Sequence, residues 1–333
     1  MIFLAVLFVA PIIEPGPPGS WEDRWVLDGH AIMVNDTLKM WYLGVSNASG
    51  FYYKGIGLAY STDSGKTWYK YPGNPVFVAD SLSNWERTSA FRSGLWEAVV
   101  IYENNEYKMW YQCRSISWNT LYATSPDGIH WTRRNEGVPV LYAGYHEDRR
   151  DTLQWDYGYA GARSVIKLNN LYYLFYEGHG YSHYASGMRM GLAIGINETT
   201  FTKAGMMGLV FTTDGTPDTL WCGKSIIPNV IIDDNTFILI YSSNSAHTGR
   251  ATVGLALSRD GINWERYWRN PICDLTQIGI PGGAITSVHW DPSSGLVKEL
   301  ACIARCGWRS FQLCIFYGKL PFLLYKQPEK GFH

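Results

Sequence analysis

A sequence unit of roughly 65 residues recurs along this chain, and no other feature limits the available folds as much. Four copies of its central strand align without gaps: LKMWYLG, YKMWYQC, YYLFYEG and FILIYSS. Their last tyrosines are Tyr42, Tyr111, Tyr176 and Tyr241, which lie 69, 65 and 65 residues apart. A degenerate fifth copy, LACIA at 300–304, follows about one interval later. Regular spacing of this kind is typical of stacked or ring-forming units.

Each copy has the same neighbours, and together they form four strands. An apolar run with a polar turn precedes it (AVVIYENNE), and a small-residue strand follows it (TVGLALS). Next come a turn and a strand that ends on an aromatic residue (SPDGIHW), and then an apolar run before a loop. Four short strands separated by turns are typical of one propeller blade. The sequence therefore predicts an all-β, five-bladed β-propeller with four-stranded antiparallel blades over residues 21–325, followed by a tail at 326–333.

The charge balance excludes two classes of partner. The chain has 28 Lys and Arg against 29 Asp and Glu, for a net charge of −1. It therefore has neither the basic footprint of a nucleic-acid-binding protein nor a polybasic membrane surface. Aromatic residues make up 15% of the chain; most suit pleated strands, and those in loops suit contact with sugar rings. We expect a monomer that binds a carbohydrate, with no nucleic acid and no membrane span.

The first ten residues, MIFLAVLFVA, are apolar and lead into a Pro- and Gly-rich stretch. The run is too short to cross a bilayer and resembles the hydrophobic part of a secretory signal, although no Lys or Arg precedes it. We therefore set residues 1–20 apart as a signal-like N-terminal segment. A secreted or periplasmic location is expected, with the cytoplasm as the alternative. The competing interpretation is a strand that closes the propeller ring.

Several acidic residues fall in tight turns outside the central strands. STDSGKTW at 61–68 matches the Asp-box of sialidases, in which the Asp and Gly form a turn and the Trp packs between blades. The later copies of this turn read SPDGIHW and SRDGINW. We therefore interpret Asp63, Asp127 and Asp260 as structural residues and not as catalytic carboxylates.

A different set of acids is expected to meet at one rim. In a meander, the start of the first strand and the end of the second lie at the same edge of the blade. Counting back fourteen residues from the marker tyrosines places Asp28 level with Glu97, and Glu177 ends a second strand. Arg163 and Lys224 stand close to the matching positions of the third and fourth blades. The alternative for each acid is a strand cap or a surface ion pair.

The loops that enter this rim are polar and aromatic, as binding loops on rigid scaffolds often are. The candidate substrate-binding residues are Arg163, Lys224, Trp96, Gln112, Trp118, His179, His183 and Asn244. His179 and His183 are expected to donate hydrogen bonds to sugar hydroxyls. As a metal pair they would need a third ligand that the sequence does not offer, and the six cysteines contain no zinc-site spacing. We predict neither a metal nor a cofactor.

With these features the chain resembles the five-bladed propeller glycosidases of families 43 and 62 (arabinanase and xylosidase type), 32 (invertase type) and 130 (mannoside phosphorylase type). The resemblance runs from Trp25 to about Leu324 and rests on the repeated MWY strand and the SPDGIHW-type turns. These features specify a fold and not an activity. By position, the resemblance implies that Asp28 is the base or nucleophile, Glu97 the carboxylate that modulates the acid's pKa, and Glu177 the general acid.

The chain also departs from those families. Leu27 and Gly29 flank Asp28, in place of the Asn and the Pro-Asn-Gly that surround the family 32 nucleophile, and no Arg-Asp-Pro triplet occurs. Glu177 comes from the end of a second strand and not from the start of a first. Asp156, in WDYGYAGAR, is therefore a rival candidate for the general acid.

Three functions remain open from the sequence. A glycoside hydrolase needs two carboxyl groups that flank the scissile bond, one as acid and one as base or nucleophile. A non-catalytic carbohydrate-binding or scaffold propeller fits the lack of a complete family signature. A glycoside phosphorylase would need a basic cluster, to which Arg163, Lys224, Arg114 and Arg250 could contribute.

Overall fold

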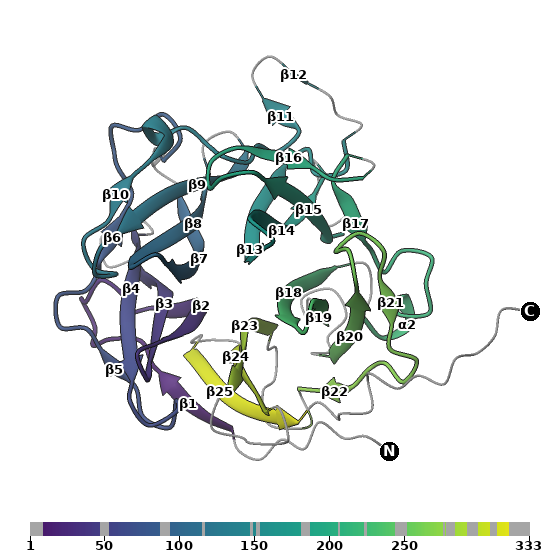
Figure 1. Cartoon of the computed structure of the whole chain (residues 1–333). Coiled ribbons are helices and arrows are strands. Elements are labelled where there is room, and N and C mark those ends of the chain that lie inside the picture. The colour runs from purple at the N-terminus through teal and green to yellow at the C-terminus, as the bar shows by residue number, and fades with distance from the viewer. Residues whose placement is uncertain are drawn as a thin grey trace, which may run out of the picture.

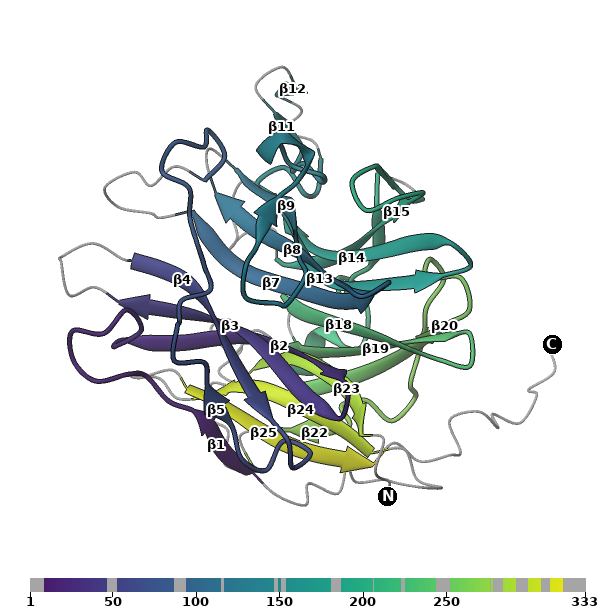
Figure 2. The same ribbon diagram turned by 60° about the vertical axis from the view of Figure 1, so that its left-hand side comes forward.

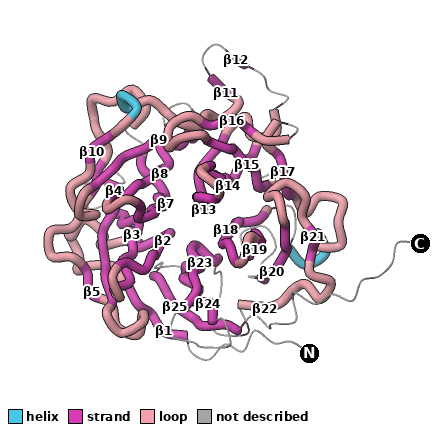
Figure 3. The backbone as a smooth tube through the Cα atoms, viewed as in Figure 1, coloured by secondary structure: helices cyan, strands magenta, loops and turns pink. Residues whose placement is uncertain are grey.

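Strands form almost all of the regular structure, as the repeat predicts (Figure 3). The computed structural model describes residues 9–46, 53–86, 94–114, 117–146, 149–150, 154–180, 187–205, 207–222, 225–243, 252–275, 277, 284–291, 299–306 and 312–319. The helical segments in this part of the chain are a 3-10 turn at Asn135–Gly137 and α2 (Thr219–Cys222). No helix among these residues is long and apolar enough to cross a membrane.

The strands form five antiparallel blades arranged around a centre (Figure 1), and blades II and III are joined into one nine-stranded sheet. Blade I contains β2 (Trp25–Val34), β3 (Thr37–Ser46), β4 (Tyr53–Ser61), β5 (Tyr69–Lys70) and β6 (Phe77–Val78). Blade II contains β7 (Leu95–Glu103), β8 (Glu106–Arg114), β9 (Trp118–Ser125) and β10 (Thr132–Arg133). Blade III contains β13 (Tyr159–Leu168), β14 (Leu171–His179), β15 (Arg189–Gly195), β16 (Phe201–Lys203) and β17 (Leu209–Phe211). Blade IV contains β18 (Ile226–Asp233), β19 (Thr236–Ser243), β20 (Thr252–Ser258), β21 (Glu265–Arg266) and β22 (Cys273–Asp274). The predicted five-bladed, all-β architecture is confirmed.

Blade V joins the two ends of the chain. Its strands are β23 (Ala284–Asp291), β24 (Glu299–Cys306), β25 (Gln312–Lys319) and β1 (Val9–Ile13), in that order. β1 pairs antiparallel with β25, so an N-terminal strand supplies the outer edge of the last blade and closes the ring (Figure 1). The propeller thus includes a strand before residue 21, where the sequence placed its start. Residues 1–8 lie outside the described part of the chain.

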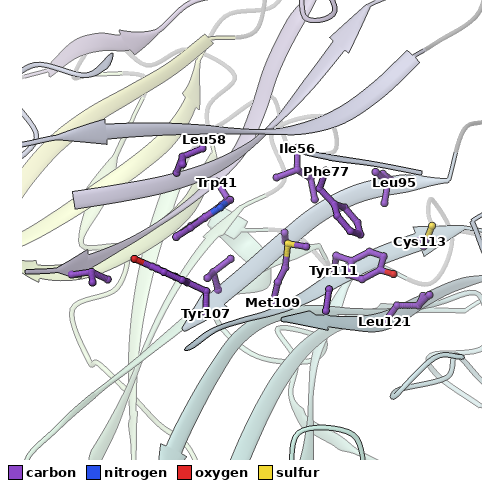
Figure 4. Packing of buried hydrophobic residues seen from close by; sticks show 14 residues of the cluster. Trp41, Ile56, Leu58, Phe77, Leu95, Tyr107, Met109, Tyr111, Cys113 and Leu121 are labelled. Carbon is purple, nitrogen blue, oxygen red and sulfur yellow. The ribbon is translucent and has the colours of Figure 1, made fainter. Parts of the chain in front are cut away.

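The repeated aromatic pair explains how neighbouring blades hold together. Successive residues of a strand point to opposite faces of the sheet. Trp41 therefore packs between blades I and II with Met109 and Tyr111 (Figure 4), whereas Tyr42 packs with Ile13 on the other face of blade I. The same alternation places Trp110 and Tyr111 in different inter-blade cores. One dipeptide per repeat thus fills the two spaces on either side of its blade.

The aspartates of the three acidic turns accept hydrogen bonds from residues of their own turns, as expected. Ser61 donates a hydrogen bond to Asp63, and the Asp63 carboxylate accepts the Thr67 backbone N–H at 2.8 Å. Asp127 and Asp260 accept backbone N–H groups of their own turns in the same way. These bonds lower the pKa of Asp63 and of Asp260 to about 2. The three carboxylates are therefore committed to local turn structure.

The first strands of the five blades, β2, β7, β13, β18 and β23, surround the centre (Figure 1). Between blades II and III, Tyr159 of β13 pairs with Trp118 of β9, which joins the two blades into one sheet at this rim. The connection between the same two blades carries a short hairpin, β11 (Tyr145–His146) and β12 (Arg149–Arg150), which stands off the ring (Figure 2).

Candidate active site

Irregularities in three first strands place the central side chains of the site. The β2–β3 register shifts between Leu27 and His30, and Asp28 in that shift has a φ of 48°. The β7–β8 register shifts around Glu97, and the β13–β14 register shifts at Arg163. A β-bulge turns a side chain away from the regular alternation of its strand, and Asp is one of the few residues that tolerates a left-handed backbone. The three blades thus present Asp28, Glu97 and Arg163 at equivalent points.

Arg163 joins two carboxylates from different blades. Its Nε donates to Glu177 Oε2 at 2.8 Å, and its Nη1 donates to Glu97 Oε2. The three side chains are only 5%, 1% and 8% exposed for Arg163, Glu177 and Glu97, respectively. A buried guanidinium stabilises the ionised form of each carboxylate beside it. One guanidinium and two ionised carboxylates carry a net charge of −1, so binding of one additional proton makes the cluster neutral.

Gln112 and Tyr159 hold the Glu97 side chain in place through hydrogen bonds. Gln112 Nε2 donates to Glu97 Oε2 at 3.3 Å and to the Ala162 carbonyl at 2.9 Å, while Tyr159 donates its hydroxyl proton to Gln112 Oε1. Tyr159 thereby sets the orientation of the amide. Burial, and next the charges of Glu177 and Asp28, raise the pKa of Tyr159 well above its usual range. Tyr159 therefore stays protonated, and it lies within electrostatic range of two of the predicted carboxylates.

The rim beside Glu97 is lined by tryptophans. Trp96 Nε1 donates to Glu97 Oε1 at 3.2 Å, and the Trp96 ring meets the Trp118 ring edge-on at 5.6 Å between centroids. Trp118 in turn lies 5.6 Å from the Tyr159 ring. The predicted substrate-binding residues Trp96, Gln112 and Trp118 thus adjoin the predicted carboxylates.

His179 lies at the edge of this group. Its ring stacks on Tyr159 at 5.1 Å, and its Nδ1 is 2.7 Å from the Gly180 carbonyl oxygen. Because a carbonyl oxygen only accepts, Nδ1 must carry the proton. Burial lowers the pKa of His179 below its usual value. The imidazole is therefore neutral at pH 7.

Lys54 also lies in the site, although it is not among the residues predicted from the sequence. Its Nζ lies 3.9 Å from the centre of the Trp96 ring and 5.9 Å from that of Trp118. Loss of solvation lowers the pKa of Lys54 to about 7, although the negative charge of Asp28 acts in the opposite direction and raises it. The repeat could have indicated this residue. Lys54 stands three residues before Gly57, the strand partner of Tyr42, and Trp118 stands three residues before Leu121, the strand partner of Tyr111. Lys54 therefore occupies in blade I the position that Trp118 occupies in blade II.

Asp156 does not join this cluster. It accepts hydrogen bonds from Lys203 at 2.5 Å and from the Tyr176 hydroxyl at 3.0 Å. Its side chain adjoins Gly178, and Tyr176 and Gly178 share the face of β14 opposite Glu177. The position favours a structural role over the rival role of general acid.

The same three-residue arrangement recurs around the ring. In four blades, an acid before the first strand pairs with a base near the fourth strand and with the marker tyrosine. The sets are Glu22–Lys70–Tyr42, Glu86–Arg133–Tyr111, Asp156–Lys203–Tyr176 and Asp218–Arg266–Tyr241. Asp156 is thus one member of a repeated blade-closing network.

We expect Asp156→Asn to reduce the free energy of unfolding by about 2 kcal/mol, because it leaves Lys203 without its counter-charge. Activity per folded molecule should stay unchanged. Asp218→Asn is the matched control in blade IV, and urea unfolding of the two variants should show similar losses. A stable Asp156→Asn variant without activity would return Asp156 to the catalytic candidates.

Three predicted residues, Lys224, His183 and Asn244, lie outside the described part of the chain. Within the described ranges, no group of three or more His, Cys, Asp or Glu side chains is arranged to hold a metal ion.

Comparison with known proteins places the fold. No protein-family model matches the chain. A stretch of 135 residues is 30% identical to the uncharacterized protein Rv1502 of Mycobacterium tuberculosis, covering 38% of this chain and 42% of that protein. A thermostable family-43 glycoside hydrolase superposes with a TM-score of 0.64 at 15% identity, over 92% of this chain and 93% of that one. The chain has the five-bladed propeller fold of these glycosidases.

A second solved structure agrees. It belongs to the GH130 family of mannoside phosphorylases, described as containing glycoside hydrolases that target β-1,2 mannosidic linkages in Candida mannan. The TM-score is 0.66 at 14% identity, over 94% of each chain. At this identity the likeness establishes the fold, and the activity has to be argued from the residues of the site.

Proposed function

We propose that this protein is a glycoside-cleaving enzyme whose substrate binds at the rim where blades I, II and III meet. The observation that carries the proposal is the pairing of Glu97 and Glu177 on one buried guanidinium, Arg163, with Asp28 from the adjoining blade. The Arg163 cluster lies outside the four repeated blade-closing sets, and it joins carboxylates of blades II and III at the rim where first strands begin and second strands end.

The chemistry requires one protonated and one ionised carboxyl group. Glu97 accepts from Arg163, Gln112 and Trp96, and three donors stabilise its anion. We propose that Glu177 carries the additional proton of the pair and donates it to the leaving oxygen. Glu97 would remain ionised and keep Arg163 in place.

Asp28 would act as the base that activates water or as the nucleophile. It comes from blade I, and Glu177 comes from blade III, so a sugar held at the rim would have a carboxyl group from each side. Both groups act electrostatically on Tyr159, which supports their closeness. Trp118, which is half-buried, offers aromatic surface for the sugar ring.

A screen of aryl glycosides and oligosaccharides, run with and without inorganic phosphate, tests the proposal. Release of sugar independent of phosphate is expected. Cleavage that requires phosphate would replace the hydrolase with a phosphorylase, a role known among GH130 proteins. Saccharide binding measured by calorimetry without any cleavage would overturn the enzymatic proposal and leave a binding propeller.

A further inference from the structure

Lys54 is a cation without an ionic partner in the described part of the chain. It lies near the start of β4, is half-buried, and contacts the faces of Trp96 and Trp118. No hydrogen bond or ion pair joins its Nζ to a described residue, although Asp28 lies within electrostatic range. Other lysines near the centre of the fold differ from it: Lys108, for example, pairs with both Glu103 and Glu198.

Keeping such a group has a cost. Loss of solvation lowers the pKa of Lys54 to about 7, which means that the folded protein binds its proton far less strongly than an exposed lysine does. A half-buried, unpaired ammonium at the mouth of a polar site favours a ligand that supplies the missing anion.

The surroundings indicate where that anion would sit. Trp96 presents its ring face to Lys54 and its N–H to Glu97, so one side chain separates the cation from the paired acids. Arg114 lies over the neighbouring Trp118 ring, with its Cζ 5.6 Å from the ring centre. Positive charge thus collects around the two tryptophan rings, and Glu97 of the Arg163 cluster lies at the N–H edge of Trp96.

We propose that Lys54 binds an anionic substituent of the sugar, namely the carboxylate of a hexuronic acid. The proposal rests on the proposed function for the identity of the sugar as substrate. A uronic acid carries its carboxylate and its glycosidic oxygen on the same ring. Its carboxylate can therefore contact Lys54 while its glycosidic oxygen lies near the carboxyl groups of the Arg163 cluster. Inorganic phosphate is the competing anion.

Direct binding tests this without requiring turnover. Glucuronate and galacturonate, their neutral counterparts glucose and galactose, and inorganic phosphate are each titrated into the full chain, with tryptophan fluorescence and calorimetry as readouts. We expect the uronates to bind about tenfold more tightly than the neutral sugars. Lys54→Met should remove that preference, so that uronates and neutral sugars bind with equal affinity, while Lys54→Arg should retain part of the preference. A thermal midpoint of Lys54→Met at or above wild type at pH 7 shows that the variant is folded.

The outcomes separate the two proposals. Equal affinity for uronates and neutral sugars, or a preference that survives in Lys54→Met, overturns the uronate site even if glycosides are cleaved. Tighter, Lys54-dependent binding of phosphate than of uronate also overturns it. Lys54-dependent uronate binding together with a complete lack of cleavage would support the anion site and overturn the glycosidase.

The pH dependence provides a second readout. The groups that face Lys54 are Asp28, Arg114 and Cys113. Burial raises the pKa of Cys113 well above its usual range, and Arg114 stays charged. Since the anion binds the protonated form of Lys54, uronate affinity should be constant below about pH 7 and fall about tenfold per pH unit above it. A profile without this fall in the wild type contradicts the proposal, and Lys54→Met should show none.

Discussion

Asp28→Asn is expected to lower glycoside turnover by about 10³-fold while leaving the propeller folded. Asparagine keeps the shape of the side chain and tolerates the left-handed backbone found at this position, where φ is 48°. What it removes is the negative charge that would activate water or attack the sugar. The measurement is kcat/KM on the best substrate of the screen, with the thermal midpoint measured in parallel.

The chain offers a matched control on the same strand pair. Asp36 also has a left-handed backbone, with φ of 58°, but it is exposed at the β2–β3 turn, the opposite end of the hairpin from Asp28. Asp36→Asn should retain full turnover. Wild-type activity in Asp28→Asn would remove Asp28 from the mechanism.

Arg163→Met is expected to lower the free energy of unfolding by about 3–5 kcal/mol, because it leaves the buried, ionised Glu97 without its counter-charge and Glu177 without its hydrogen-bond donor. The loss should be largest at neutral pH. It should shrink as the pH falls, since protonating Glu97 removes the unpaired buried charge. Urea unfolding followed across pH measures both effects.

Two comparisons show whether this loss comes from the cluster. Adding Glu97→Gln to Arg163→Met removes the unpaired charge and should recover part of the stability. Arg189→Met breaks a partly exposed pair with Asp214 and should change stability by about 1 kcal/mol or less. An Arg163→Met variant no less stable than Arg189→Met would contradict the buried cluster.

The propeller could be predicted because its repeat has a packing cause. Trp41 and Tyr42 fill the spaces on the two sides of one blade. The next three blades repeat this with a buried apolar residue before the marker tyrosine (Trp110, Phe175 and Ile240), so the sequence keeps the pattern and its spacing. Counting from those tyrosines also placed Asp28 level with Glu97, with Arg163 one residue after the matching position of the third blade. The bulges that turn these side chains follow from strand register, which the sequence pattern does not contain.

The surroundings of Asp156 and Lys54 could be recognised only from the structure. Asp156 stands just before a first strand, as an active-site acid could, but its partner Lys203 lies 47 residues further along the chain and is brought to it by the fourth strand. Lys54 matches no motif, because a lone lysine at the start of a strand usually lies in solvent. Only the position of Trp96 on the neighbouring blade shows that its ammonium is half-buried.

The central claim is that the Asp28, Glu97, Glu177 and Arg163 side chains surround the scissile bond of a sugar. A crystal structure of the Asp28→Asn variant soaked with the best substrate of the screen tests it most directly. We predict an intact saccharide at the rim between blades I and III, in contact with Asn at position 28, Glu177 and the Trp118 ring. A saccharide bound elsewhere on the propeller, with this rim empty, would contradict the account.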